Sequence, residues 1–287
     1  MGIIWEAFFS FSTQTIFDYQ PGSEMQATTK PHILITNDDG VNAPGLSALA
    51  ESLATVGRVT IIAPGRNWSA SGHSKTMHKP LRVDQGNLPN GMPALVTTGA
   101  PSDAVALGLL GLAESPVDLV VTGINRGENL GHDVTYSGTV TAAMEGAIGG
   151  VPAFAISLAT WEVGADYRVA ANFAARLARW VLAHSLPTHV LLNVNVPALP
   201  AAEIRGVQVT RMGLRIYRDQ LVRREDPFGR PYYWIGGERP TGVAEPGTDF
   251  AALAEGYISV TPLQLDFTAH TSLTRLRQQE IETLSIT

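Results

Sequence analysis

From His32 onward, short apolar segments alternate with longer segments whose apolar residues recur at helical spacing, and this alternation strongly constrains the fold. The short segments predict buried strands and the longer ones predict helices. Fully apolar strands separated by helices are typical of an α/β fold, in which helices cover both faces of a mostly parallel sheet through right-handed crossovers. Strands are predicted at 32–36, 58–64, 118–123, 151–158 and 189–197, and helices at 44–56, 101–113, 137–150 and 165–184.

The composition changes after Pro200, where the chain becomes richer in Arg, Gly, Pro and aromatic residues. Two extended segments, 214–222 and 232–235, flank a turn at 226–231 and predict a long β-hairpin. Residues 247–263 predict a short helix followed by a strand. The hairpin belongs either to a second small subdomain or to an arm that extends onto a symmetric partner.

The composition bounds the function before any motif is considered. Hydrophobic residues make up 45% of the 287 residues and charged residues 16%, which indicates a folded chain with a large core. The formal net charge of −6 argues against a broad surface for nucleic acid or acidic membranes. Because the chain has no cysteine, disulfides, a thiolate nucleophile and cysteine-ligated zinc are excluded, and any metal must be bound by oxygen or imidazole.

The segment before Met25 is rich in aromatic residues but contains no Lys or Arg, so it lacks the charged region of a signal peptide. We expect residues 1–30 to be a disordered extension or the product of a misassigned start, with Met25 as the natural first residue. The alternative is an appended partner-binding segment. The domain is expected to span 31–270, including an arm at 207–247, and to be followed by a tail at 271–287. No apolar run approaches about 20 residues, so no membrane span is predicted and a cytoplasmic protein is expected.

An acidic pair follows the first predicted strand, in the sequence Asn37-Asp38-Asp39-Gly40. In an open α/β sheet, ligands bind beyond the carboxyl ends of the strands, which is where this pair falls. Two such carboxylates repel each other by roughly 4 kcal/mol when they are about 4 Å apart at an effective dielectric constant of about 20. A divalent cation is the simplest way to remove that cost. The alternative is an Asp-Gly turn with both acids solvated.

Three further polar clusters lie on later connections from strand to helix, at 66–73, 123–131 and 136–139. The second is rich in glycine but does not match the dinucleotide-binding fingerprint, which argues against an NAD-linked oxidoreductase. The third, Tyr136-Ser137-Gly138-Thr139, opens a helix, where Ser is an ordinary N-cap. A glycine between two hydroxyl residues at a helix N-terminus is also suited to binding phosphate.

The carboxyl ends of parallel strands meet at one edge of a sheet, so these four clusters are expected to come together. They combine two carboxylates, Ser and Asn oxygens, a glycine-rich backbone and a helix N-terminus. That set predicts a site for a hard cation beside a site for an oxyanion. The chemistry it indicates is phosphoryl hydrolysis by a metal-activated water.

Six segments resemble successive motifs of the SurE (stationary-phase survival) nucleotidase family: LITNDDGVNAPG, APGRNWSASG, TTGAPSDAVALGL, DLVVTGINRGENLG, YSGTVTAAMEG and TDFAALAEGYISVTPLQLDFT. The similarity runs from about Pro31 to His270. It implies a Rossmann-like domain with a swapped C-terminal arm, in homodimers or homotetramers. It also implies divalent-metal-dependent hydrolysis of nucleoside 5′- and 3′-monophosphates, with some action on short polyphosphate.

Carried over by motif, the resemblance also implies a set of site residues. The catalytic residues would be Asp38 and Asp39, with Asp38 favoured as the general base. One Mg²⁺ or Mn²⁺ would be bound by Asp38, Asp39, Ser69 and Asn125. The substrate phosphate would be bound by Asn37, Asn129, Ser137, Gly138 and Thr139. No duplex nucleic acid or membrane is expected as a partner. A non-catalytic nucleotide or phosphate sensor on the same fold is the alternative, but a sensor gains nothing from two carboxylates beside phosphate.

Overall fold

A computed structural model describes residues 30–284, except 239 and 280. The predicted extension at 1–30 therefore lies, apart from Lys30, outside the described residues. The helices are α1 (Pro44–Ala54), α2 (Pro101–Leu107), α3 (Gly138–Ile148), α4 (Arg168–His184), α5 (Asp249–Ala254) and α6 (His270–Gln278). The strands are β1 (His32–Thr36), β2 (Arg58–Pro64), β3 (Val83–Asn87), β4 (Pro93–Thr97), β5 (Leu119–Arg126), β6 (Ala153–Ala159), β7 (Val190–Pro197), β8 (Val207–Val209), β9 (Arg215–Ile216), β10 (Asp219–Glu225), β11 (Pro231–Gly237), β12 (Thr241–Gly242) and β13 (Ile258–Gln264).

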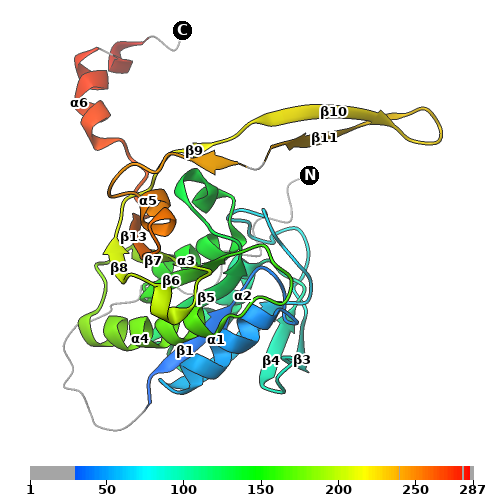
Figure 1. Cartoon of the computed structure of the whole chain (residues 1–287), viewed down its shortest axis with the longest axis vertical. Helices are drawn as coiled ribbons and strands as arrows, with labels where there is room; N and C mark the ends of the chain where they lie inside the picture. The colour runs from blue at the N-terminus through cyan, green and yellow to red at the C-terminus, as the bar shows by residue number, and fades with distance from the viewer. Residues whose placement is uncertain (1–29, 239, 280, 285–287) are drawn as a thin grey trace, which may run out of the picture.

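Nine strands of the described residues form the main sheet in the order β3-β4-β2-β1-β5-β6-β7-β13-β8, which confirms the predicted fold class, and β10-β11 and β12-β9 form two small sheets. The strands from β4 to β7 in this order pair in parallel. The antiparallel pairs lie toward the two edges, where β3 joins β4 and β13 joins β7. Parallel pairing places the carboxyl ends of β1, β2, β5, β6 and β7 along one edge of the sheet, where the polar clusters were expected to meet (Figure 1).

Helices cover both faces of the sheet, so the core has two layers. Alternate residues of a strand point to opposite faces, and in β1 Ile33 and Ile35 pack into the layer beneath α1 and α4. Leu34 between them packs into the other layer, which includes residues of α2 and α3. This double burial explains why the strand reads as a continuous apolar run.

The predicted hairpin is present as β10 and β11, which pair antiparallel from Asp219 opposite Gly237 to Glu225 opposite Pro231. It extends away from the sheet and its helices, as an arm rather than as part of a second subdomain with its own core (Figure 1). Several elements are not predicted from the sequence: strands β3 and β4, the short strands β8 and β12, and helix α6, which lies mostly in the predicted tail. The helix predicted at 101–113 is α-helical only to Leu107, and the segment Gly108–Leu112 that follows is kinked at Gly111, which has a φ of +133°. Within the described residues, no helix is long and apolar enough to cross a membrane.

Candidate active site

The loop after β1 owes its shape to Asn37 and Gly40. The Asn37 side chain is fully buried, and its Nδ2 donates to Gly40 O at 3.0 Å while its Oδ1 accepts from Gly40 N at 3.2 Å. Gly40 has a φ of +99°, a conformation that residues with a side chain rarely adopt. Both the Nδ2 and the Oδ1 atoms of Asn37 therefore form hydrogen bonds within the loop. These bonds hold the loop in a tight turn that has Asp38 and Asp39 at its centre.

Asp38 is buried, with only 3% of its surface exposed. Its Oδ1 accepts a hydrogen bond from the Thr139 hydroxyl at the start of α3. Burial raises the pKa of Asp38 from 3.8 to about 6, because removal from water disfavours the ionised form more than the bond from Thr139 favours it. The neighbouring charge of Asp39 raises the pKa of Asp38 further.

Asp39 is only partly buried and receives hydrogen bonds from two other loops. Asn67 Nδ2, in the loop after β2, donates to Oδ1 at 3.3 Å, and the backbone N–H of Arg126, at the end of β5, donates to Oδ2 at 3.3 Å. Burial raises the pKa of Asp39, while the bond from Arg126 and its positive charge oppose that rise. The ends of β1, β2 and β5 therefore meet at the acidic pair, as the sequence predicts.

The loop after β2 brings Ser69 toward the same place. Trp68 N donates to Asp38 O at 2.7 Å, and Ser69 N donates to Asn67 Oδ1 at 2.7 Å. Asn67 thus contacts both Asp39 and the backbone of Ser69, which is solvent-exposed. Through Asn67, this loop ties the exposed Ser69 to Asp39.

Asn125 lies near the end of β5, opposite Ser157 in the register with β6. Its Nδ2 donates to Gly127 O at 2.8 Å, so the oxygen Oδ1 is the atom it can offer to a cation. The next residue, Arg126, donates its backbone N–H to Asp39. Asn125 is therefore the chain neighbour of a residue that contacts the acidic pair.

Asn129 lies in a different hydrogen-bond network. Its side-chain Nδ2 donates to Ser157 Oγ at 2.8 Å, and its backbone N donates to Asn195 Oδ1 at 2.8 Å. Its carbonyl oxygen accepts from Asn193 and Asn195 at 2.8 and 3.0 Å. The structure therefore fixes Asn129 to β6 and β7, and none of these bonds is made to Asp38 or Asp39.

The N-terminus of α3 packs against the acidic pair. Ser137 Oγ accepts from Val140 N at 3.1 Å, so Ser137 is an N-cap. A Cβ on Gly138 would lie 2.7 Å from the Cβ of Asp38 and 3.1 Å from Ser71 Oγ, so only glycine fits here without displacing Asp38. Within the described residues, the buried hydroxyl of Ser71 has no hydrogen-bond partner. An unpaired buried hydroxyl at a helix N-terminus beside a glycine is suited to an oxyanion.

Sequence reasoning missed a second buried carboxylate that shapes this edge. Asp249, fully buried at the start of α5, accepts from Gly131 N and Gly213 N at 2.8 Å each. It thereby joins the loop that precedes α3 to the base of the arm. The motif that contains it, TDF, was recognised in the sequence, but nothing in the local pattern shows which backbone groups the carboxylate would bind.

The donor atoms gathered here suit a hard divalent cation. They are the carboxylates of Asp38 and Asp39, the hydroxyl of Ser69 and the amide oxygen of Asn125, and Mg²⁺ and Mn²⁺ prefer oxygen ligands of these kinds. No cluster of three or more His, Cys, Asp or Glu side chains that could hold a metal occurs in the part of the chain the structure describes. A metal site here would therefore rest on two carboxylates with neutral oxygens. The elevated pKa of both acids fits it, since a bound cation would stabilise their charge.

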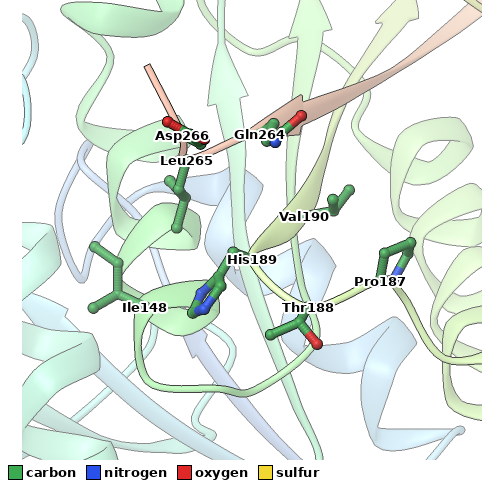
Figure 2. A pocket seen from close by; sticks show the side chains of 8 residues that line it. All are labelled: Ile148, Pro187, Thr188, His189, Val190, Gln264, Leu265 and Asp266. Carbon is green, nitrogen blue, oxygen red and sulfur yellow. The ribbon is translucent and has the colours of Figure 1, made fainter. Parts of the chain in front are cut away.

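A cavity of about 750 Å³ lies elsewhere (Figure 2). It is lined by Ile148 at the end of α3 and by residues around the start of β7 and the end of β13. From Gly138 to Ile148, α3 rises roughly 15 Å, so this cavity is at the opposite end of the helix from the acidic pair. Among the described residues, Asp266 is the one carboxylate that lines this cavity, so the cavity lacks the paired carboxylates that make the acidic pair the candidate site.

Comparison with known proteins agrees with the resemblance seen in the sequence. The family described as "Survival protein SurE" matches residues 33–219. A protein of Chloroflexus aggregans named "5'-nucleotidase SurE" is 50% identical over 252 residues, covering 88% of this chain and all of the relative. One of the same name from Herpetosiphon aurantiacus is 52% identical over 238 residues, covering 83% and 93%. The crystal structure of the SurE protein from Aquifex aeolicus superposes with a TM-score of 0.76 at 41% identity, covering 87% of this chain and all of that one. This chain therefore belongs to the SurE family.

Proposed function

We propose that this protein is a metal-dependent 5′-nucleotidase that hydrolyses nucleoside monophosphates to nucleoside and phosphate. The observation that carries the proposal is the contact between the acidic pair and the N-terminus of α3. Thr139 donates to Asp38, and Gly138 approaches Asp38 so closely that no side chain fits between them. A cation bound by the acidic pair and an oxyanion bound at the start of α3 would thus be adjacent. The relatives named 5′-nucleotidase, at about half identity over most of the chain, support the same activity.

Asp38, Asp39, Ser69 and Asn125 would hold one divalent cation, Mg²⁺ or Mn²⁺. When bound there, the cation would lower the pKa of its water and neutralise charge on the phosphate. The protein's part is to keep these oxygens close together. It does so with the Asn37–Gly40 bonds within the first loop and the backbone bonds that the other loops make to the acidic pair.

The substrate phosphate would bind at the start of α3. The first N–H groups of a helix have no partner within the helix, and the positive end of its dipole favours an anion. Ser137, Gly138 and Thr139 form this turn, and the unpartnered hydroxyl of Ser71 faces the same glycine. We assign to Thr139 a second role, because its hydroxyl also orients Asp38. Asn37 and Asn129 would act on the phosphate less directly, through the loops that they brace.

Asp38 is our preferred proton acceptor during hydrolysis. Its buried carboxylate lies against the start of α3, where the substrate phosphate would bind, so it is placed to accept a proton from the attacking water. The bond from Thr139 holds one oxygen in place and leaves the other for substrate or water. A non-catalytic sensor would have no use for such a base, so the enzyme is favoured over that alternative.

The wider substrate range implied by the resemblance fits a site that contacts phosphate more than nucleoside. We therefore extend the proposal to 3′-monophosphates and short polyphosphate, in a cytoplasmic enzyme. The arm is proposed to join two or four copies of the chain, since it carries exposed apolar side chains that soluble monomers usually bury. Examples are Leu221, Trp234 and Ile235, of which Trp234 is 63% exposed.

The test is release of inorganic phosphate from AMP, with and without EDTA. We expect EDTA to abolish release and Mg²⁺ or Mn²⁺ to restore it. Asp39→Asn should reduce turnover by about a hundredfold or more, because it removes a ligand from the metal. The exposed Asp84 on β3 supplies the matched control, and Asp84→Asn should behave as the wild type. Turnover that survives EDTA, or that Asp39→Asn leaves unchanged, would refute the proposal.

A further inference from the structure

Another buried carboxylate, Glu145, lies on α3 outside the site described above. It is 8% exposed, and its two oxygens contact a histidine and a lysine side chain. His73 Nε2 lies 3.0 Å from Oε2, and Lys75 Nζ donates to Oε1 at 2.8 Å. The bond from His73, helped by Lys75, holds the pKa of Glu145 below its usual range, so this carboxylate is ionised and paired at neutral pH.

Both partners belong to the loop that carries Ser69 and Ser71. Between the end of β2 and the start of β3, this loop contains no helix or strand, so only specific contacts hold it in place. Further along, Thr76 is bound by the buried carboxylate of Asp103, with its N–H at 2.9 Å and its hydroxyl at 2.6 Å. The loop is thus held by carboxylates on two different helices.

The contacts with α3 lie along a single face of that helix. Gly138, Thr141 and Glu145 are spaced by three and four residues, which places them on one face. In the same order along the chain, the Gly138 position meets Ser71, Thr141 Oγ1 donates to Gly72 O at 3.0 Å, and Glu145 contacts His73 and Lys75. The loop therefore runs along the helix whose N-terminus forms the proposed phosphate site.

We propose that Glu145 is a positioning residue, which holds the loop against α3 so that Ser69 is presented to the cation bound by the acidic pair. It touches neither the substrate nor the metal. This inference rests on the proposed function, because it assumes that Ser69 is a metal ligand. A merely structural salt bridge would stabilise the fold without changing how tightly the metal binds.

The test is a double-mutant cycle in which Mn²⁺ binding is measured by calorimetry on the full chain without substrate. Glu145→Gln keeps the size of the side chain and removes its charge. We expect it to weaken Mn²⁺ binding about fivefold or more in the wild type, but less than about twofold in a Ser69→Ala background. In the second background the ligand that Glu145 positions is already gone. Glu245→Gln, which breaks the exposed pair with Arg211, is the matched control and should leave binding unchanged.

Lys75→Met gives a second route, because this side chain is 54% exposed and its loss should not prevent folding. Lys75→Met should weaken Mn²⁺ binding in the wild type but much less in the Ser69→Ala background. If Glu145→Gln does not fold, this variant tests the positioning role instead. Unchanged Mn²⁺ affinity, or an equal loss in both backgrounds, would overturn the proposal. So would an unchanged affinity in Ser69→Ala alone. A wild-type protein that binds no Mn²⁺ would instead refute the proposed metal site.

Discussion

Replacing Asp38 with asparagine should make the metal-free protein more stable at neutral pH while it abolishes activity. The ionised Asp38 carboxylate is buried beside a second acid, with one hydrogen bond from Thr139. Without a cation this arrangement is unfavourable, because burial penalises the charge. Asparagine has nearly the same shape, keeps Oδ1 as an acceptor for Thr139 and carries no charge. The substitution therefore removes both the free-energy penalty of the buried charge and the proposed metal ligand.

The magnitude follows from the pKa of Asp38. The folded-state pKa is raised from 3.8 to about 6, a difference of about two pKa units, which corresponds to roughly 3 kcal/mol at about 1.36 kcal/mol per unit. Between these two pKa values the folded state binds more protons than the unfolded state, so stability falls as the pH rises. The penalty is therefore absent below about pH 4 and fully present above about pH 6 to 7. Asp38→Asn should therefore regain this lost stability only above about pH 6 to 7.

The assay is thermal unfolding in EDTA at about pH 7.5 and again at about pH 4. At the higher pH, a gain of roughly 3 kcal/mol should raise the Tm by roughly 6 to 12 °C, since a domain of about 150–250 residues gains roughly 2 to 4 °C per kcal/mol. At the lower pH the two proteins should unfold together. The exposed Asp84→Asn should show no gain at either pH. If Asp38→Asn were no more stable than the wild type at neutral pH, burial of an uncompensated charge would not describe this site.

Three further outcomes are expected. Ser137→Ala should cost roughly 1 kcal/mol of stability through the lost N-cap and should also weaken inhibition by inorganic phosphate; an unchanged inhibition constant would leave Ser137 as a helix cap only. Gly138→Val should raise the KM for AMP and weaken Mn²⁺ binding, because a Cβ there would lie 2.7 Å from that of Asp38; normal values of both would contradict the close packing. Trp234→Ser together with Leu221→Ser should shift sedimentation toward the monomer, whereas a wild type that is already monomeric at micromolar concentration would refute an associating arm.

The fold was predictable where strands are buried on both faces. The bounds of β1 and β2 match the predicted segments, because both strands contain continuous apolar runs between loops. The hairpin of β3 and β4 was missed, since β3 has the sequence VDQGN, which is largely exposed and polar and contains a glycine typical of turns. Helix α6 was missed for a related reason: none of its residues is buried, so its sequence carries no apolar stripe against a core.

The proximity of the site loops was also predictable, but the partners of individual side chains were not. The topology of a parallel sheet brings the acidic pair, Asn67 and Arg126 to one edge, and the structure joins them by hydrogen bonds. Nothing in the local sequence shows that the Thr139 hydroxyl would bind Asp38. Nor does it show that Asn129 would be bound to residues of β6 and β7.

Helix α3 has both features that the sequence predicts and contacts that only the tertiary structure shows. Its spacing alone places Gly138, Thr141 and Glu145 on one face, and that much can be read from the sequence. Glutamate is a residue type that usually faces solvent, yet here Glu145 faces inward, toward His73 and Lys75 of a neighbouring loop. A buried carboxylate is tolerated only with such partners. The inward orientation of Glu145 therefore implies that a neighbouring segment supplies its partners. Only the tertiary structure identifies that segment as the loop that contains Ser69.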